Sequence, residues 1–127
     1  MTGVQTCALP IFEAGADIFL MPSKYEPCGL NQMYSMRYGT VPVVRRTGGL
    51  ADTVQPVNLE QGIGAGFTFD HYDEWNFRAA IEAAISAWRQ PELWKRIMVN
   101  GMTTDFSWSR SAQKYLAVYQ RYSNANR

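Results

Sequence analysis

Residues 26–30 combine a carboxylate with a backbone that is expected to offer hydrogen-bond donors; they read Glu-Pro-Cys-Gly-Leu. Pro27 fixes its own φ and disfavours the helical conformation at Glu26, because the proline ring crowds the residue before it. We expect Cys28, Gly29 and Leu30 to form the first turn of a helix, whose N–H groups lack intrahelical partners and attract anions. Gly29 has no side chain, so a phosphate could approach the backbone closely. The Glu26 carboxylate would repel a bare phosphate but could accept hydrogen bonds from sugar hydroxyls, so the stretch fits a sugar phosphate.

The same stretch has a second interpretation that needs no ligand. Ser23 and Glu26 satisfy the Ser-x-x-Glu capping pattern, so a helix could begin at Lys24 with Pro27 in its first turn. The spacing alone does not choose between capping and sugar-phosphate binding. Cys28 is expected to line such a site rather than to act as a nucleophile, because no candidate base stands near it in the sequence.

A second glycine-bearing loop, Thr47-Gly48-Gly49, comes after the next expected strand. A Gly-Gly pair alone usually marks only a turn, and the chain has neither a GxGxxG nor a Walker motif. Its position matters more than its composition, because two such loops after successive strands would face one cleft. Arg45 and Arg46 precede this loop, and we interpret them as a solvated strand end.

The elements that must position these loops follow the pattern of a doubly wound α/β domain. Apolar runs predict strands over 16–23, 40–46 and 66–69, with Pro42 either at the start of its strand or on a sheet edge. A helix is expected over 30–38, with one stripe made of Leu30, Met33, Tyr34 and Arg37. Gly39 follows it, where a helix end favours a left-handed residue. Ligands of such folds bind outside the carboxyl ends of the strands, where both loops fall.

Three helices are expected in the second half of the chain. The first runs from Glu74 to Trp88 with Asp73 as its N-cap, the second from Pro91 to about Gly101, and the third begins after Ser107. The first helix is expected to bury a face made of Phe77, Ile81, Ala84, Ile85 and Trp88. The third helix has an aromatic side, which we interpret as a packing surface rather than a cofactor site: Trp108, Ala112, Tyr115, Leu116, Tyr119 and Tyr122.

Composition excludes several classes of function. The 127 residues hold twelve Lys and Arg against eleven Asp and Glu, a formal net charge of +1, which gives no footprint for nucleic acid. No apolar run approaches the length of a membrane span. The two cysteines, Cys7 and Cys28, form no CxxC pair, and His71 is the one histidine, in a polar turn, so neither a zinc site nor a disulfide framework is expected.

The first twelve residues, MTGVQTCALPIF, do not match the rest of the chain. They lack the charged region and the long apolar stretch of a signal peptide and have no regular period. They resemble translated sequencing-adapter sequence, so we expect native sequence from about Phe12 or Glu13. The alternative is a genuine but irregular N-terminus.

A family resemblance is carried by the segment PSKYEPCGLNQMYSMRYGTVPVVRRTGGLADTV, together with AGADIFLMPS before it and FSWSRSAQKYLAVY near the end. Residues 13–122 resemble the bacterial glycogen synthase and plant starch synthase family, glycosyltransferase family 5. The resemblance implies a GT-B fold, in which two Rossmann-like domains enclose the active site. Residues 13–106 would be part of the C-terminal, nucleotide-sugar-binding domain, and residues 107–127 a crossover helix and tail that return toward the N-terminal domain.

The resemblance also implies an activity: retaining transfer of glucose from ADP-glucose to the non-reducing end of an α-1,4-glucan. Glu26 would be the catalytic residue at the transferred glucose. The glucose and diphosphate would be held at Cys28, Gly29 and Leu30, and bordered by Thr47 and Gly48. Related retaining enzymes have a second carboxylate where this chain has Tyr34, which favours starch and glycogen synthases over sucrose-type relatives.

The implied partners are the nucleotide sugar, the α-glucan and the N-terminal domain, with no metal, cofactor, nucleic acid or membrane. Bacterial cytoplasm or plastid stroma would be the location. The basic residues and the adenine contacts that such a donor site needs are expected upstream of this chain, so the chain by itself is expected to be inactive. The alternatives are a non-catalytic nucleotide-sugar-binding fragment and a retaining glycosyltransferase of the sucrose-synthase-like type.

Overall fold

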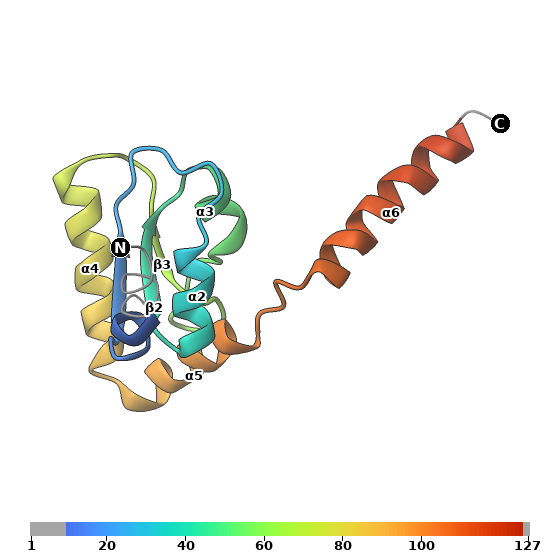
Figure 1. Ribbon diagram of the computed structural model, residues 1–127. Coiled ribbons are helices and arrows are strands. Elements are labelled where there is room, and N and C mark those ends of the chain that lie inside the picture. Colours follow the sequence, from blue (N-terminus) through green and yellow to red (C-terminus); the bar gives the residue numbers. More distant parts are fainter. Residues whose placement is uncertain (1–9, 126–127) are drawn as a thin grey trace, which may run out of the picture.

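A computed structural model describes residues 10–125 of the chain (Figure 1). Its three strands form one parallel sheet in the order β1-β2-β3, so the predicted α/β class is confirmed. Cys7 and residues 1–9 of the predicted non-native N-terminus lie outside the described residues. After a helical turn at residues 10–14, the elements are β1 (Ile18–Met21), α2 (Asn31–Tyr38), β2 (Val41–Arg45), α3 (Gly48–Thr53), β3 (Phe67–Phe69), α4 (Glu74–Trp88), α5 (Pro91–Thr103) and α6 (Trp108–Ala125).

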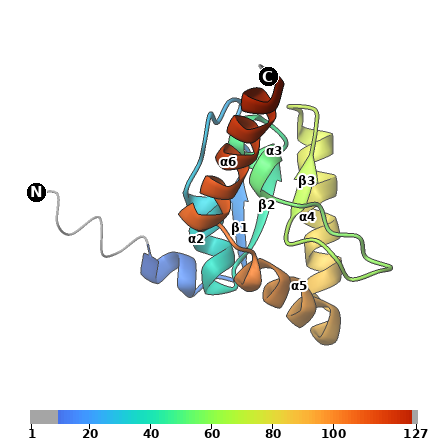
Figure 2. The same ribbon diagram turned by 90° about the vertical axis from the view of Figure 1, so that its right-hand side faces the viewer.

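Helices cover both faces of the sheet, as Figures 1 and 2 show. α4 packs on one face and α2 and α3 on the other, while α5 contacts both α2 and α4 at the end of the sheet opposite the loops (Figure 1). β2 contributes to both cores, because Val43 joins the cluster under α4 and Val44 the cluster under α2 and α3. A strand buried on both faces reads as a continuous apolar run, which is why residues 41–44 show no alternation.

Pro42 lies near the start of the central strand, so its predicted edge position is wrong and its predicted place at a strand start is right. Val41 donates its N–H to the Asp17 carbonyl oxygen on the β1 side, at 2.9 Å. The next peptide group therefore faces the β3 side, where pairing begins only at Val43 opposite Phe67. The N–H that proline lacks would have had no ladder partner there, so the residue is tolerated.

The helix ends that the sequence predicts are confirmed. Gly39 ends α2 in the left-handed conformation, with φ of 88°. The Asp73 carboxylate accepts a hydrogen bond from the Asn76 N–H at 2.8 Å, so Asp73 caps α4. α5 begins at Pro91, as predicted, and continues two residues beyond Gly101.

The buried face of α4 differs from the prediction. Its buried residues are alanines, Ala84 as predicted and also Ala80 and Ala87, whereas Ile85 and Trp88 are 37% and 47% exposed. Small side chains let the helix approach the sheet closely, so the bulky residues lie at the flanks of the contact rather than beneath it. Phe77 and Ile81 pack partly against the core, as predicted.

The predicted face of α2 is also wrong. Its buried residues are Gln32, Ser35 and Met36, whereas Leu30 and Tyr34 are half exposed. Two of the three inward residues are polar, and each is hydrogen-bonded within the chain: Ser35 Oγ donates to the Gln32 carbonyl oxygen at 3.0 Å. Polar side chains that make hydrogen bonds can be buried, although Gln32 Oε1 accepts none within residues 10–125, so a search for an apolar stripe selects the opposite side.

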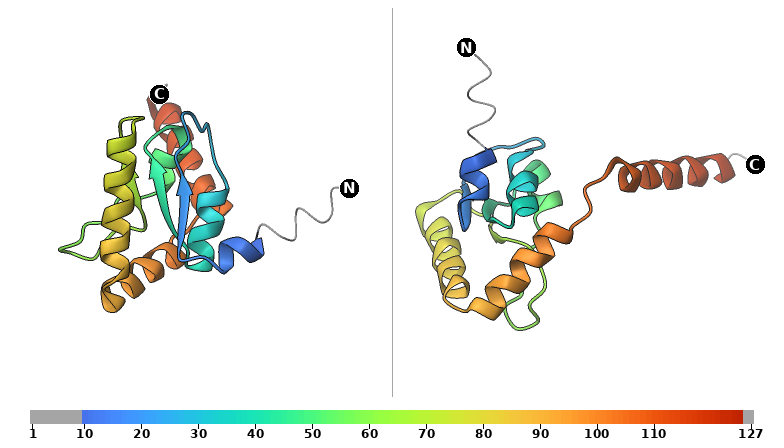
Figure 3. Two further views of the ribbon diagram at one scale, coloured as in Figure 1. Left: turned by 90° about the vertical axis from the view of Figure 1, so that its left-hand side faces the viewer. Right: turned by 60° about the horizontal axis from the view of Figure 1, so that its bottom comes forward.

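α6 projects away from the body of the molecule, as Figures 1 and 3 show. Its aromatic side chains are exposed: Trp108 by 88%, Tyr115 by 65%, Tyr119 by 70% and Tyr122 by 67%. Within residues 10–125 the aromatic side of α6 therefore packs against no other element, although the sequence analysis interprets it as a packing surface. None of the helices in residues 10–125 combines the length and the apolar character needed to cross a membrane.

Candidate functional site

The two glycine-bearing loops meet above the carboxyl ends of β1 and β2. The Gly49 N–H is shared between the carbonyl oxygens of Glu26 and Pro27, at 3.2 and 3.1 Å. A Cβ added to Gly49 would lie 2.1 Å from the Cys28 carbonyl oxygen, so only glycine permits this approach. The structure thus brings residues 26–28 of the first loop against Gly48 and Gly49 of the second, and the loops touch each other rather than standing across an open space.

The first loop does not have either predicted backbone arrangement. α2 begins at Asn31 with Leu30 as its N-cap, so the helix starts neither at Lys24, as the capping box requires, nor at Cys28. Gly29 has φ of 66°, a left-handed conformation that interrupts a right-handed helix. Residues 28–30 therefore form a turn that leads into α2 instead of belonging to it.

The N–H groups of this turn still have the property on which the sugar-phosphate hypothesis depends. Within residues 10–125, the backbone hydrogen bonds of the loops include none donated by Cys28, Gly29 or Leu30. Glu26 is half buried beside them, and Cys28 is exposed with a free thiol. A carboxylate next to several available N–H donors can receive a polyhydroxylated ligand that also carries negative charge.

Gln32 is a site residue that the sequence analysis missed. Its side chain is fully buried, and Nε2 donates to the Gly29 carbonyl oxygen at 2.9 Å and to Thr53 Oγ1 at 3.0 Å. Thr53 Oγ1 in turn donates to the Gly49 carbonyl oxygen at 2.6 Å. A polar residue directly after the loop is the only sequence signal for this role, and it is weak, because the partner in α3 is 21 positions away.

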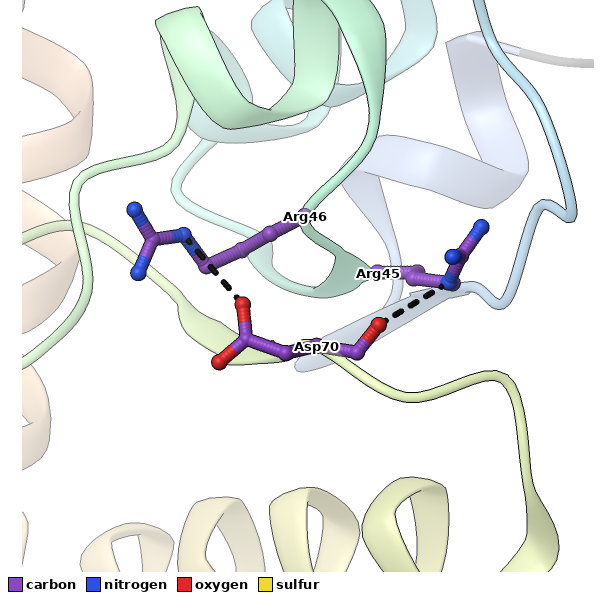
Figure 4. A network of polar contacts seen from close by, with 3 residues as sticks. All are labelled: Arg45, Arg46 and Asp70. Atoms are coloured by element: carbon purple, nitrogen blue, oxygen red, sulfur yellow. Dashed lines mark hydrogen bonds and ion pairs between the residues drawn. The ribbon is translucent and has the colours of Figure 1, made fainter.

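Arg45 and Arg46 have different environments, although the sequence analysis treats them together (Figure 4). Arg46 is a solvated strand end, as predicted, with its Nε 3.8 Å from an Asp70 carboxylate oxygen and both side chains well exposed. Arg45 is half buried and braces the first loop: Nη1 donates to the Lys24 carbonyl oxygen at 2.5 Å and Nε to the Asp70 carbonyl oxygen at 3.1 Å. Its guanidinium also lies 5.5 Å from the centre of the Tyr72 ring.

Leu30 also borders a groove of about 410 Å³ between α2, α3 and the start of α6. Asp52 of α3, Asp105, and Arg110 and Lys114 of α6 are the charged residues that line this groove. His71 is exposed in the turn before α4, as predicted. Across the described residues, no group of three or more His, Cys, Asp or Glu side chains is arranged to hold a metal ion.

The sequence matches the model of a family described as glycosyl transferases group 1 over residues 3–100. The chain belongs to this family. It is 55% identical over 109 residues to the glycogen synthase of Thermotoga petrophila, which covers 85% of the chain. It is 51% identical over 114 residues to the glycogen synthase of Kosmotoga olearia, which covers 90% of the chain.

Two solved structures have a fold similar to that of this chain. The catalytic domain of starch synthase IV from Arabidopsis thaliana, bound to ADP and acarbose, superposes with a TM-score of 0.72 at 42% identity. The match covers 83% of this chain and 22% of that one. Sucrose-phosphate synthase from Thermosynechococcus elongatus gives a TM-score of 0.65 at 25% identity, over 93% of this chain and 28% of that one. The glycosyltransferase fold expected from the sequence is confirmed, and the chain spans about a fifth of the glycogen synthases that it matches, 22% for that of T. petrophila.

Proposed function

We propose that this glycosyltransferase-family chain is the donor-binding segment of an α-1,4-glucan synthase, which transfers glucose from ADP-glucose to the non-reducing end of a glucan with retention of configuration. The observation that carries this function is that the loop holding the Glu26 carboxylate also holds the N–H groups of residues 28–30, which donate no backbone hydrogen bonds within residues 10–125. The glycogen synthases among the relatives, and the starch synthase that binds ADP and acarbose, support this choice of substrates.

The two halves of the site have different tasks in this reaction. The N–H groups of Cys28, Gly29 and Leu30 bind the diphosphate, which gains negative charge as the bond to glucose breaks. Glu26 accepts hydrogen bonds from the glucose hydroxyls and stabilises the positive charge that develops at the anomeric carbon. In this proposal the N–H donors stabilise the negative charge of the transition state and the carboxylate stabilises its positive charge.

The second loop supports the first one and borders the donor. Thr47 precedes α3 and has an extended backbone. Its N–H donates a hydrogen bond to the Arg45 carbonyl oxygen at 2.9 Å. Gly48 has φ of 46° and closely approaches the Glu26 backbone. Both residues therefore bound the volume in which the donor sits, and neither supplies a charged group.

The remaining contacts to the nucleotide and to the glucan come from a second domain of a longer protein. The aromatic side of α6 is the surface of this chain that faces such a domain. The alternative is a non-catalytic role, in which the chain binds the nucleotide sugar without transferring glucose. This alternative is favoured by the fact that Glu26 and the loop N–H groups, which are proposed to bind the donor, all lie within this short segment.

A segment exchange tests this function. The matching segment of the T. petrophila glycogen synthase is replaced by residues 13–121 of this chain, and transfer of labelled glucose to glycogen is measured with ADP-glucose and with UDP-glucose. We expect transfer with ADP-glucose. An exchanged enzyme that is folded by its thermal transition, and binds ADP-glucose by calorimetry without transferring glucose, would favour the non-catalytic alternative.

A further inference from the structure

One continuous set of hydrogen bonds links the two site loops. Gly49 donates its N–H to the carbonyl oxygens of Glu26 and Pro27, and its own carbonyl oxygen accepts from Thr53 Oγ1 at 2.6 Å. Thr53 Oγ1 accepts a hydrogen bond from Gln32 Nε2 at 3.0 Å. Gln32 Nε2 also donates to the Gly29 carbonyl oxygen in the first loop. We call this set the Gln32–Thr53 clasp.

Gln32 contacts the loop at two successive peptide groups. Its Nε2 donates to the Gly29 carbonyl oxygen at 2.9 Å and lies 3.3 Å from that of Cys28. A trans peptide group is planar, and its N–H points away from its C=O. Two carbonyl oxygens that are held inward by Gln32 therefore turn the N–H groups of Gly29 and Leu30 outward.

The side chain of Gln32 is suited to this task by its chemistry and its burial. The amide nitrogen supplies two N–H donors without a charge, whereas a carboxylate of the same shape would place negative oxygens against three acceptors. Gln32 is fully buried, so water does not replace a lost bond at low cost. Its Oε1 would lie 2.6 Å from a Cβ at Gly29, so a larger residue there would require the Gln32 amide to shift.

We propose that Gln32 and Thr53 are positioning residues for the donor site: through the clasp they orient the N–H groups of Gly29 and Leu30 toward the diphosphate and hold the two loops at a fixed separation. The functional half of this inference rests on the proposed donor-binding function. The structural half of the inference is that the clasp holds the two loops together, and it does not depend on any ligand.

Isosteric variants isolate the clasp. Thr53→Val removes the hydroxyl that joins Gln32 to Gly49, and Thr53→Ser keeps it. Gln32→Glu keeps the shape of the side chain and removes both donors. Thr103→Val is the matched control, because Thr103 Oγ1 makes the same bond to the carbonyl oxygen four residues back, that of Val99, at 2.7 Å, and Thr103 is not part of the clasp.

The first measurement is amide hydrogen exchange at Gly49 in the 127-residue chain, followed by NMR. We expect exchange to be about tenfold faster or more in Thr53→Val and Gln32→Glu than in wild type, and unchanged in Thr53→Ser and Thr103→Val. Equal exchange at Gly49 in Thr53→Val and Thr103→Val would overturn the clasp. This measurement uses no ligand, so it decides the clasp even if ADP-glucose proves not to be the donor.

The second measurement uses the exchanged synthase described above. We expect Thr53→Val to raise KM for ADP-glucose about tenfold and to leave KM for glycogen unchanged, with Thr53→Ser close to wild type. A smaller fraction of folded enzyme would lower kcat and change neither KM. An unchanged KM for ADP-glucose in Thr53→Val would therefore reject the positioning role, whereas an exchanged enzyme without any transfer activity would contradict the proposed function instead.

Discussion

Gly48 packs against Glu26 so closely that a Cβ at Gly48 would lie 2.1 Å from the Glu26 carbonyl oxygen. The contact joins a loop after β2 to the residue that we assign to catalysis, and it is a backbone contact that no side-chain rotation can relieve. Gly48 also has φ of 46°, which other residues adopt at a cost. The glycine pair of the second loop is therefore a packing requirement of the first loop.

We expect Gly48→Ala to lower the free energy of unfolding by about 2 kcal/mol or more, because steric overlap adds to backbone strain. Urea titration followed by circular dichroism measures this. Ala51→Ser is the control in the same helix, at an exposed position, and should lie within about 0.5 kcal/mol of wild type. A Gly48→Ala variant as stable as this control would contradict the close approach of the loops.

Glu26→Gln in the exchanged synthase should reduce kcat by about two orders of magnitude or more, since the neutral amide stabilises developing positive charge poorly. Initial rates of glucose transfer measure this loss. Glu60→Gln removes a carboxylate from an exposed loop and should leave the rate unchanged. Near-normal transfer by Glu26→Gln would remove Glu26 from the catalytic role.

The two arginines at the end of β2 form a natural comparison. Arg45→Met should lower the free energy of unfolding by roughly 1 kcal/mol, because the Lys24 and Asp70 carbonyl oxygens lose a charged donor. Arg46→Met should change it by only a few tenths of a kcal/mol, since its ion pair is exposed and long. Equal effects of the two variants in urea titrations would show that Arg45 does not brace the loop.

The Asp73 cap predicts a pH dependence with a definite sign. Hydrogen bonds from the Asn76 backbone and side chain lower the pKa of the Asp73 carboxyl below its usual value. The folded state therefore favours the ionised form, and the stabilisation is present above the pKa of the unfolded chain and is lost as the pH falls through the lowered pKa. Asp73→Ala should lower the melting temperature at neutral pH. The difference from wild type should vanish in acid, and a difference that is constant down to strongly acidic pH would contradict this cap.

Truncation of two tryptophans should change the free energy of unfolding by very different amounts. Trp94 of α5 is buried in the core under α4, so Trp94→Ala should cost about 3–5 kcal/mol of unfolding free energy. Trp108 of α6 is 88% exposed, so Trp108→Ala should leave the stability of this chain within about 0.5 kcal/mol of wild type. A large loss for Trp108→Ala would show that α6 packs on the body in solution.

Local features of this chain were predictable from its sequence, because each depends on residues that are close together along the chain. The apolar runs at 18–21, 41–45 and 67–69 became strands, Gly39 and Asp73 ended and began their helices, and the composition of residues 26–30 pointed to available N–H donors. The family follows from such stretches too. These features need only backbone preferences and short-range hydrogen bonds.

Contacts between distant segments were decided by the tertiary structure. The inward side of α2 became Gln32 and Ser35 rather than the apolar stripe, because α3 places Thr53 where its hydroxyl accepts a hydrogen bond from Gln32 Nε2. Pro42 became tolerable in a central strand because β3 begins one residue further on. The sequence alone thus determined which residues form strands and helix ends, and it pointed to residues 26–30 as a candidate site loop. Only the fold decided that Gly49, Thr53 and Gln32 bind that loop, since periodicity within a segment contains no information on the segment packed against it.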